Sequence, residues 1–328
     1  IKDPELLKFI DIECFCWSVM PALKTPMINA GMVFTDRHVG GINYPKGGVG
    51  TIAEKLVKGL EKLGSKIRYK ANVKEILIED NNAIGVKLSN GEELFAKTII
   101  SNSTRWDTFG LNDEKKGLVD KEFVSRKEHN WKNNYKPSPS FVSIHIGVDK
   151  KIINPNFNCH HIIVENWDKL EDEKGVIFIS IPTLLDKNLA PEGKHIVHAF
   201  TPSSINEWEN LTRKEYLLKK ENYFNFIIKK ISKIIPEIKD SIDHKEIGTP
   251  KTHKKFLGRF EGSYGPIPKK KLLGLLPMPF NTTSIKNLYC VGDSCFPGQG
   301  LNAVAFSGYA CAHKIGSKLK INSPKLPD

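Results

Sequence analysis

The sequence predicts a mixed α/β fold in which an antiparallel sheet forms a second domain. Three features support this. Glycines cluster at residues 43–50 just before a helical pattern, several strand patterns follow one another across residues 141–200, and a buried-type strand at 287–291 leads into a loop and a helix of small residues. The 328 residues are enough for one large domain or two ordinary ones.

The first predicted helix follows the glycine-rich segment. Thr51 and Glu54 match the capping-box pattern that is typical of a helix start, and Gly64 ends the helix. Between Thr51 and Gly64, apolar residues recur at helical spacing, namely Ile52, Leu56, Leu60 and Leu63. A glycine-rich loop that opens a helix favours anion binding, because the first N–H groups of the helix are free.

A β-rich stretch comes next. The predicted strands are 66–69, 73–79, 84–88, 93–95 and 97–100. The third and fourth strands form a hairpin around Asn90 and Gly91. The last strand ends in Ser101 and Asn102, and polar residues at this position are typical of a buried strand that meets a ligand at its carboxyl end.

The middle of the chain predicts the antiparallel sheet. Residues 106–139 are charged and read as helical, and strands are then predicted at 141–148, 161–165, 176–181 and 196–200. A long amphipathic helix spans residues 214–235 and is terminated by Pro236. We expect the four strands to form one sheet in a domain of its own.

The end of the chain carries the most specific pattern. Gly292 and Asp293 end the strand 287–291, and there the Asp293 carboxylate can accept hydrogen bonds from ligand hydroxyls. Gly298 and Gly300 allow backbone to approach a ligand closely. The free N–H groups of the following helix point at a phosphate or carbonyl oxygen. A ribityl phosphate chain that ends in a flavin ring satisfies these demands.

A second motif overlaps this one. Residues 298–303 match G-x-G-x-x-A, the dinucleotide-binding fingerprint. That fingerprint also needs a second strand with an acidic residue about 20 positions later. Only 25 residues follow the match, and they show no strand pattern, so we do not predict a complete dinucleotide-binding unit here.

Composition limits the classes of partner. The net charge is +12, which fits solvated lysines spread over the surface or attraction to an anionic lipid surface or nucleic acid. Basic and aromatic residues do not interleave as a nucleic-acid groove requires, so no nucleic-acid partner is predicted. The six cysteines form no C-x-x-C pair. Cys159, His160 and His161 are adjacent on a strand and alternate in direction, so no metal site is predicted.

Several long segments identify a family resemblance. Residues 288–313, LYCVGDSCFPGQGLNAVAFSGYACAH, closely resemble the end of the carotenoid isomerases, the cyanobacterial and plastid relatives of phytoene desaturase. Other matching segments are 25–50, 101–110, 180–193, 248–259 and 264–276. Together the segments extend over essentially the whole chain, so the resemblance is to this subfamily and not to flavoproteins in general.

The resemblance implies a fold and its domains. It implies an incomplete FAD/NAD(P)-binding Rossmann-like flavoprotein domain plus an antiparallel-sheet substrate domain. Residues 1–40 and 140–260 would bind substrate, 41–110 and 280–320 would remain from the FAD domain, and 111–139 would connect them. Family members begin with a G-x-G-x-x-G unit for the ADP half of FAD, which is not in this sequence, so we expect a fragment or a truncated gene product.

The resemblance also implies an activity. It is FAD-dependent cis–trans isomerisation of poly-cis-lycopene (prolycopene) to all-trans-lycopene, with reduced FAD as the active form and NAD(P)H as an indirect reductant. The substrate is an apolar carotenoid, and the enzyme would lie peripherally on a plastid membrane or a cyanobacterial thylakoid or plasma membrane. Two alternatives remain open: a carotene desaturase or saturase on the same scaffold, and an inactive remnant. The sequence does not predict the oligomeric state.

The resemblance places the site residues as follows. The strand at Val73 passes the adenine. Ser101 and Asn102 would lie near the cofactor. The ribityl chain and flavin would be held by Gly292, Asp293, Gly298, Gly300, Leu301, Asn302 and Ala303. Asp36 and His38 are candidate catalytic residues, and the alternative is an ordinary ion pair. The sheet at 141–200 and the apolar stretch 272–280 would line the substrate side, and the alternative for the latter is ordinary core.

Overall fold

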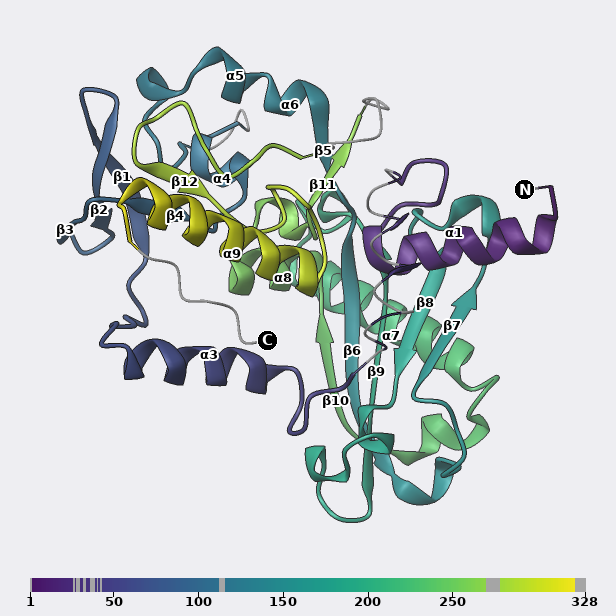
Figure 1. The fold of residues 1–328 in the computed structure, drawn as a ribbon. Helices are drawn as coiled ribbons and strands as arrows, with labels where there is room; N and C mark the ends of the chain where they lie inside the picture. The colour runs from purple at the N-terminus through teal and green to yellow at the C-terminus, as the bar shows by residue number, and fades with distance from the viewer. Residues whose placement is uncertain are drawn as a thin grey trace. The chain divides into compact units, whose positions relative to one another are not determined.

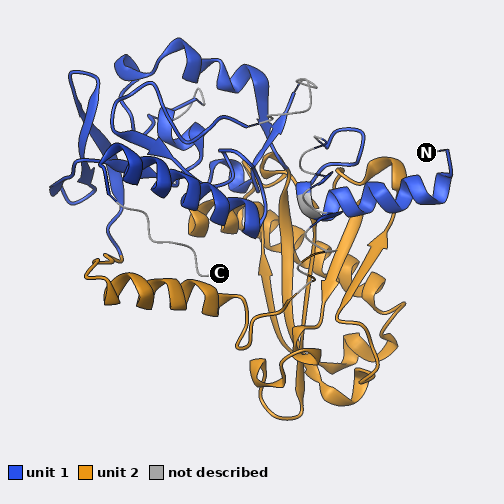
Figure 2. Cartoon of the chain, viewed as in Figure 1, with its two compact units in different colours: residues 1–35, 70–138, 258–328 blue, residues 36–69, 139–257 orange. Residues whose placement is uncertain are grey.

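The computed structural model describes residues 2–25, 27, 30, 31, 34, 35, 39, 41, 43–111, 116–269 and 278–321. The chain forms two compact units, shown in Figure 2. Unit 1 comprises Ile1–Thr35, Lys70–Ser138 and Gly258–Asp328, and unit 2 comprises Asp36–Tyr69 and Pro139–Leu257. These compact units group the chain differently from the functional ranges given above, because the start of the chain joins unit 1 and the first predicted helix joins unit 2.

Unit 2 is built on the predicted antiparallel sheet. Its strands are β6 (Ser140–Asp149), β7 (His160–Val164), β8 (Val176–Ser180), β9 (Lys194–Ser203) and β10 (Ile242–Gly248). They lie in the order β10-β6-β9-β8-β7, and each neighbouring pair is antiparallel (Figure 1). The four predicted strands and their single sheet are confirmed, whereas β10 was not predicted.

Helix α7 (Arg213–Ile231) covers one face of this sheet. Thr212 and Glu215 form a capping box at its start. The buried face of the helix, with Phe224, Ile227 and Ile231, packs in one apolar cluster with the inward residues of the sheet, such as Ile144 and Ile179. The predicted helix is confirmed, although it ends at Ile231 and not at Ile235. A shorter helix, α8 (Pro250–Leu257), follows β10.

The helix predicted after the glycine-rich segment is present as α3 (Gly50–Lys62). Its predicted capping box is wrong. The helix begins two residues earlier than a cap at Thr51 requires, so Thr51 lies inside the first turn, where its hydroxyl donates to the Gly48 carbonyl at 2.8 Å. The strand predicted at 66–69 is also wrong, because these residues lie outside any helix or strand.

Unit 1 begins with α1 (Pro4–Ser18) and contains a small antiparallel sheet. Its strands are β1 (Val73–Glu79), β2 (Asn82–Leu88) and β3 (Glu93–Phe95). Gly91 in the β2–β3 turn has φ +90°, which explains the glycine there. The hairpin prediction is confirmed. Within the described ranges of the chain, we find no helix with the length and apolarity needed to cross a membrane.

A second, parallel pair of strands joins distant parts of unit 1. β4 (Ile99–Ser101) pairs with β12 (Leu288–Cys290), and α9 (Leu301–Lys318) follows β12 after a loop. The predicted strand, loop and helix at this end are therefore confirmed. A further short pair joins β5 (Tyr135–Pro137) to β11 (Pro266–Pro268).

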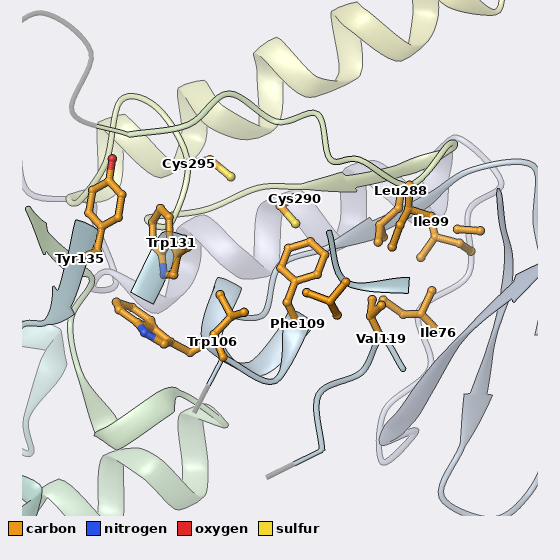
Figure 3. Close-up of a cluster of buried hydrophobic side chains, with 14 of the residues drawn as sticks. Ile76, Ile99, Trp106, Phe109, Val119, Trp131, Tyr135, Leu288, Cys290 and Cys295 are labelled. Atoms are coloured by element: carbon orange, nitrogen blue, oxygen red, sulfur yellow. The ribbon is translucent and has the colours of Figure 1, made fainter. Parts of the chain in front are cut away.

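In the described part of the region predicted as helical, residues 106–111 and 116–139, the α-helices are short. These are α4 (Arg105–Phe109), α5 (Arg126–His129) and α6 (Trp131–Asn134), and β5 follows them. Their apolar side chains join those of the parallel strands in one buried cluster, which Figure 3 shows. The region is therefore folded into the core of unit 1.

Candidate functional site

The carboxyl ends of β4 and β12 define the site. The strands run in parallel with Cys290 opposite Ser101, so both end at the same edge. The Val291 N–H extends the ladder by donating to the Ser101 carbonyl at 2.9 Å. Asn102 and the Gly292 turn therefore lie next to each other, although they are far apart in the sequence. This is the edge at which parallel strands commonly meet a ligand.

Gly292 is required by the close approach of Asn102. Its φ is +93°, and a Cβ at this position would lie 2.6 Å from the Asn102 side-chain oxygen. Its N–H donates to the hydroxyl of Ser307, in α9, at 3.2 Å. A larger residue would displace either the amide of Asn102 or the turn.

The carboxylate of Asp293 is ion-paired with Arg259. The two side chains are partly buried, and the Arg259 Nε also donates to the Ser263 carbonyl at 2.6 Å. The second carboxylate oxygen of Asp293 lies 3.4 Å from the Ser294 hydroxyl. The Arg259 guanidinium therefore balances the negative charge of the Asp293 carboxylate, which was expected to accept hydrogen bonds from ligand hydroxyls. The role of Asp293 in ligand binding stays a prediction.

The first two side chains of α9 are exposed. Gly300, with φ +98°, precedes the helix and provides no side-chain cap. Leu301 and Asn302 are exposed, whereas Ala303 is buried. An α-helix leaves the N–H groups of its first turn without partners inside the helix, and these groups carry a partial positive charge. An oxygen of a bound anion or carbonyl is suited to this position.

One buried acceptor lies beside that turn. The Gln299 side chain donates from its nitrogen to the Pro266 carbonyl at 3.1 Å. Its oxygen is buried and has no hydrogen-bond partner among the described residues. Gly265 permits this arrangement, since a Cβ there would come within 2.6 Å of the Gln299 side chain. Buried acceptors are normally satisfied, so this oxygen fits a donor from a ligand.

A buried ion pair supports the turn from below. Arg105 in α4 contacts Glu128 in α5 at 2.8 Å, and the two side chains are only 3% and 5% exposed. The same guanidinium donates to the carbonyls of Ser294, at 3.3 Å, and Phe280, at 3.0 Å. It also lies over the ring of Trp131, which Figure 3 labels in the adjacent core. Arg105 thus holds the segment after Asp293 in place.

Sequence reasoning missed this pair. Arg105 belongs to one of the segments that resemble the carotenoid isomerases, but Glu128 lies 23 residues away and shares no motif with it. An arginine at the start of a short helix that also carries Trp106 and Phe109, four residues after the end of a strand, is the signal that was available.

The two cysteines around the turn have thiols of low reactivity. Cys290 and Cys295 are fully buried, and burial raises the pKa of each thiol. A thiol with a raised pKa is a poor nucleophile at neutral pH because little thiolate is present. Covalent catalysis from these positions is therefore disfavoured.

The structure brings most of the predicted site residues together. Ser101, Asn102, Gly292 and Asp293 meet at the strand ends, and the segment from Gly298 to Ala303 continues from there into α9. Val73 lies in the small antiparallel sheet, where its register partner is Leu88. The candidate catalytic residues, Asp36 and His38, and the stretch 270–277 lie outside the described residues.

Comparison with known proteins identifies relatives. Prolycopene isomerase 1, chloroplastic, from an Oncidium hybrid cultivar is 58% identical over 323 residues, which are 98% of this chain and 54% of that protein. The chain is homologous to the plant prolycopene isomerases. It spans about half the length of these relatives. The resemblance seen in the sequence is thereby confirmed.

More distant relatives agree on the fold. A neurosporene-forming phytoene desaturase of Rhodobacter capsulatus is 24% identical over 298 residues, 87% of this chain and 55% of that protein. The solved structure of an oxidoreductase from Methanosarcina mazei matches with a TM-score of 0.65 at 18% identity, covering 95% of this chain and 65% of that one. The mixed α/β prediction is confirmed by this likeness. No protein-family model matches the chain.

Proposed function

We propose that this chain serves the FAD-dependent cis–trans isomerisation of poly-cis-lycopene to all-trans-lycopene. The observation that carries the proposal is the 58% identity, over 98% of the chain, with a protein named prolycopene isomerase. The desaturase relative is far less similar, at 24% identity, which favours isomerisation over net oxidation. Because the relatives are named chloroplastic, we also propose that the protein works in plastids.

The residues at the end of β12 fit the non-nucleotide half of a flavin. The start of α9, which has no side-chain cap, suits an electronegative oxygen, and the buried Gln299 oxygen suits a donor. Asn102 and Gly292 lie in contact at the adjoining strand ends, and Asp293 is ion-paired with Arg259. A reduced flavin held there would supply transient electron or proton donation to a cis double bond and would recover what it donated after the bond has rotated, so that no net oxidation or reduction results. The chain's own residues hold and orient the reacting partners.

The chain can also associate with a membrane surface. Its net charge is +12, and each basic group near an anionic lipid surface adds roughly 1 kcal/mol of attraction. An apolar carotenoid partitions into lipid, so peripheral binding would bring the protein to its substrate. NAD(P)H would act only as an indirect source of reduced flavin.

Asp36 and His38 remain the proposed catalytic residues. Replacing His38 by Ala should lower isomerase turnover at least about tenfold, as expected for loss of an acid–base group. The matched control is His244→Ala, because His244 is an exposed residue of β10. Equal turnover in the two variants would remove His38 from the mechanism.

One assay distinguishes the functions. The purified chain is incubated anaerobically with poly-cis-lycopene, FAD and a reductant, and the products are separated by chromatography and weighed by mass spectrometry. Isomerisation gives all-trans-lycopene of unchanged mass. A desaturase or saturase changes the mass by two hydrogens. If the folded chain yields neither product and shows no flavin absorbance, the proposal is wrong.

A further inference from the structure

One edge of β12 is closed by Asn281. The Val291 N–H bonds to β4, and successive residues of a strand direct their backbone groups to opposite edges, so the backbone groups of Cys290 point away from β4. There the Asn281 carbonyl accepts from the Cys290 N–H at 2.8 Å, and the Asn281 side-chain amide donates to the Cys290 carbonyl at 2.9 Å. Asn281 is only 6% exposed, so this amide is shielded from water.

The next N–H on that edge belongs to Gly292, and a serine of α9 binds it. The Gly292 N–H donates to the Ser307 hydroxyl at 3.2 Å. The Asn281 amide donates to the same hydroxyl at 3.2 Å, and it also lies 3.3 Å from the Ser307 carbonyl. One buried hydroxyl therefore joins the strand edge, the turn after it and the helix.

Ser307 lies in the middle of the buried face of α9. This face consists of Ala303, Ser307 and Cys311, which are spaced by four residues along the helix shown in Figure 1. Alanine and a free cysteine pack as small apolar residues, whereas a hydroxyl is costly to bury unless it is hydrogen-bonded. Ser307 is 0% exposed. Packing alone is satisfied by an apolar side chain here, so the hydroxyl points to a role in its hydrogen bonds.

The position of Ser307 controls the direction of the helix start. It follows Leu301, the first residue of α9, by six residues, which is about 9 Å along a helix axis. A helix is rigid over this length, so fixing Ser307 against Gly292 and Asn281 also fixes where the N–H groups of the first turn point. These are the groups suited to an electronegative oxygen of the flavin.

We propose that Asn281 and Ser307 are positioning residues of the flavin site, which hold the start of α9 in register with the turn after β12. The inference rests on the proposed function for the nature of the ligand. Neither side chain needs to touch the flavin. Both act through Gly292 and through the helix, whose start carries a partial positive charge.

The first test compares two hydroxyl deletions in the full chain. Ser307→Ala should weaken FMN binding about tenfold, the upper range for one lost hydrogen bond, in isothermal titration calorimetry. The matched control is Thr283→Val. The Thr283 hydroxyl bonds the Leu288 carbonyl at 2.9 Å, at the other end of β12, and accepts from the Ile285 N–H at 3.1 Å. This control should lose stability in urea but bind FMN as the wild type does.

The second test uses the charge of the flavin to separate positioning from stability. Reduced flavin carries more negative charge at neutral pH than oxidised flavin, so a well-aimed helix start favours the reduced form. Titrations under nitrogen with oxidised and with dithionite-reduced FMN give the ratio of the two affinities. In Ser307→Ala this ratio should shift about threefold against reduced FMN. A loss of stability alone leaves the ratio unchanged.

Two further variants guard against a chain that does not fold. Ser307→Cys keeps the volume of the side chain but offers a weak acceptor, so it should weaken FMN binding several-fold. Asn281→Ala should weaken FMN binding as Ser307→Ala does. If the two residues act as one unit, the double variant should lose little more affinity than either single variant. Additive losses would contradict the shared role.

The outcomes separate this inference from the proposed function. If the wild-type chain binds FMN and the folded variants Ser307→Ala, Ser307→Cys and Asn281→Ala bind it equally well, with an unchanged ratio for the two redox forms, the positioning role is wrong and the flavin site stands. A folded wild-type chain that binds neither form of FMN overturns the flavin site, and the positioning role with it. Weaker binding in these variants but not in Thr283→Val, with the shifted ratio, supports the proposal even in a chain that does not isomerise.

Discussion

Replacing Glu128 by Gln should destabilise unit 1 by about 3 to 5 kcal/mol. The variant keeps the shape of the side chain but leaves the guanidinium of Arg105 buried without its counter-charge. Removing one partner of a buried pair costs about this much, because the remaining charge has lost its water. The pair lies at 2.8 Å with side chains that are 3% and 5% exposed, so solvent screens it little.

The chain contains a matched control. Lys87 and Glu93 form an ion pair with the same 2.8 Å separation, but their side chains are 39% and 38% exposed. Exposed pairs contribute roughly 0 to 1 kcal/mol, so Glu93→Gln should change the stability by no more than that. The comparison isolates burial from distance.

Urea unfolding followed by tryptophan emission measures both variants. Trp106 and Trp131 lie in the core cluster beside Arg105 and report on its surroundings. The free energy of unfolding is taken from the linear dependence on urea. A loss of less than about 1 kcal/mol in Glu128→Gln, equal to that of Glu93→Gln, would refute the idea that this pair holds the turn.

Three further predictions follow from the site and the sheet. In urea unfolding, Gly292→Ala should destabilise the fold by about 1 to 3 kcal/mol more than Gly91→Ala. Both glycines have φ near +90°, but of the two only Gly292 has a neighbour within 4 Å of the added Cβ. Equal losses of stability in the two variants would contradict the close approach of Asn102 to Gly292. Asp293→Asn should weaken flavin binding about tenfold with the fold intact, since it loosens the turn beside α9, whereas Asp120→Asn at an exposed pair should leave flavin fluorescence titrations unchanged. Burial lowers the pKa of His198 to about 4, so the unfolded chain binds the extra proton between pH about 6.5 and 4, and stability falls as the pH falls through that window. Between pH about 6.5 and 4, the free energy of unfolding of His198→Phe should therefore fall less than that of the wild type, by a difference of at most about 3 kcal/mol. An unchanged fall would show that His198 is not the group responsible.

Local patterns predicted the elements that their own residues specify. The strands of unit 2 other than β10 combine apolar side chains with buried neighbours, and the Asn90–Gly91 turn matches the backbone that a tight hairpin needs. β10 was missed because its sequence, IDHKEIG, is charged and forms a strand only by pairing with β6. The strand predicted at 66–69 has the right residue types but no described strand partner.

The candidate site was predicted in part for a similar reason. The Gly292 turn and the start of α9 follow from a continuous segment, so their sequence was sufficient to find them. The partners of Asp293 and Arg105 come from other segments, and no spacing along the chain indicates such contacts.

The central claim is that the turn after β12 and the start of α9 hold the non-nucleotide half of a flavin. Titrating the folded chain with FMN and with FAD, and following flavin fluorescence, tests it most directly. The account predicts saturable binding of FMN that competes with FAD and weakens in Gly292→Ala but not in Gly91→Ala. If a folded chain leaves the fluorescence of both flavins unchanged, or if Gly292→Ala binds them as the wild type does, the site has been placed wrongly.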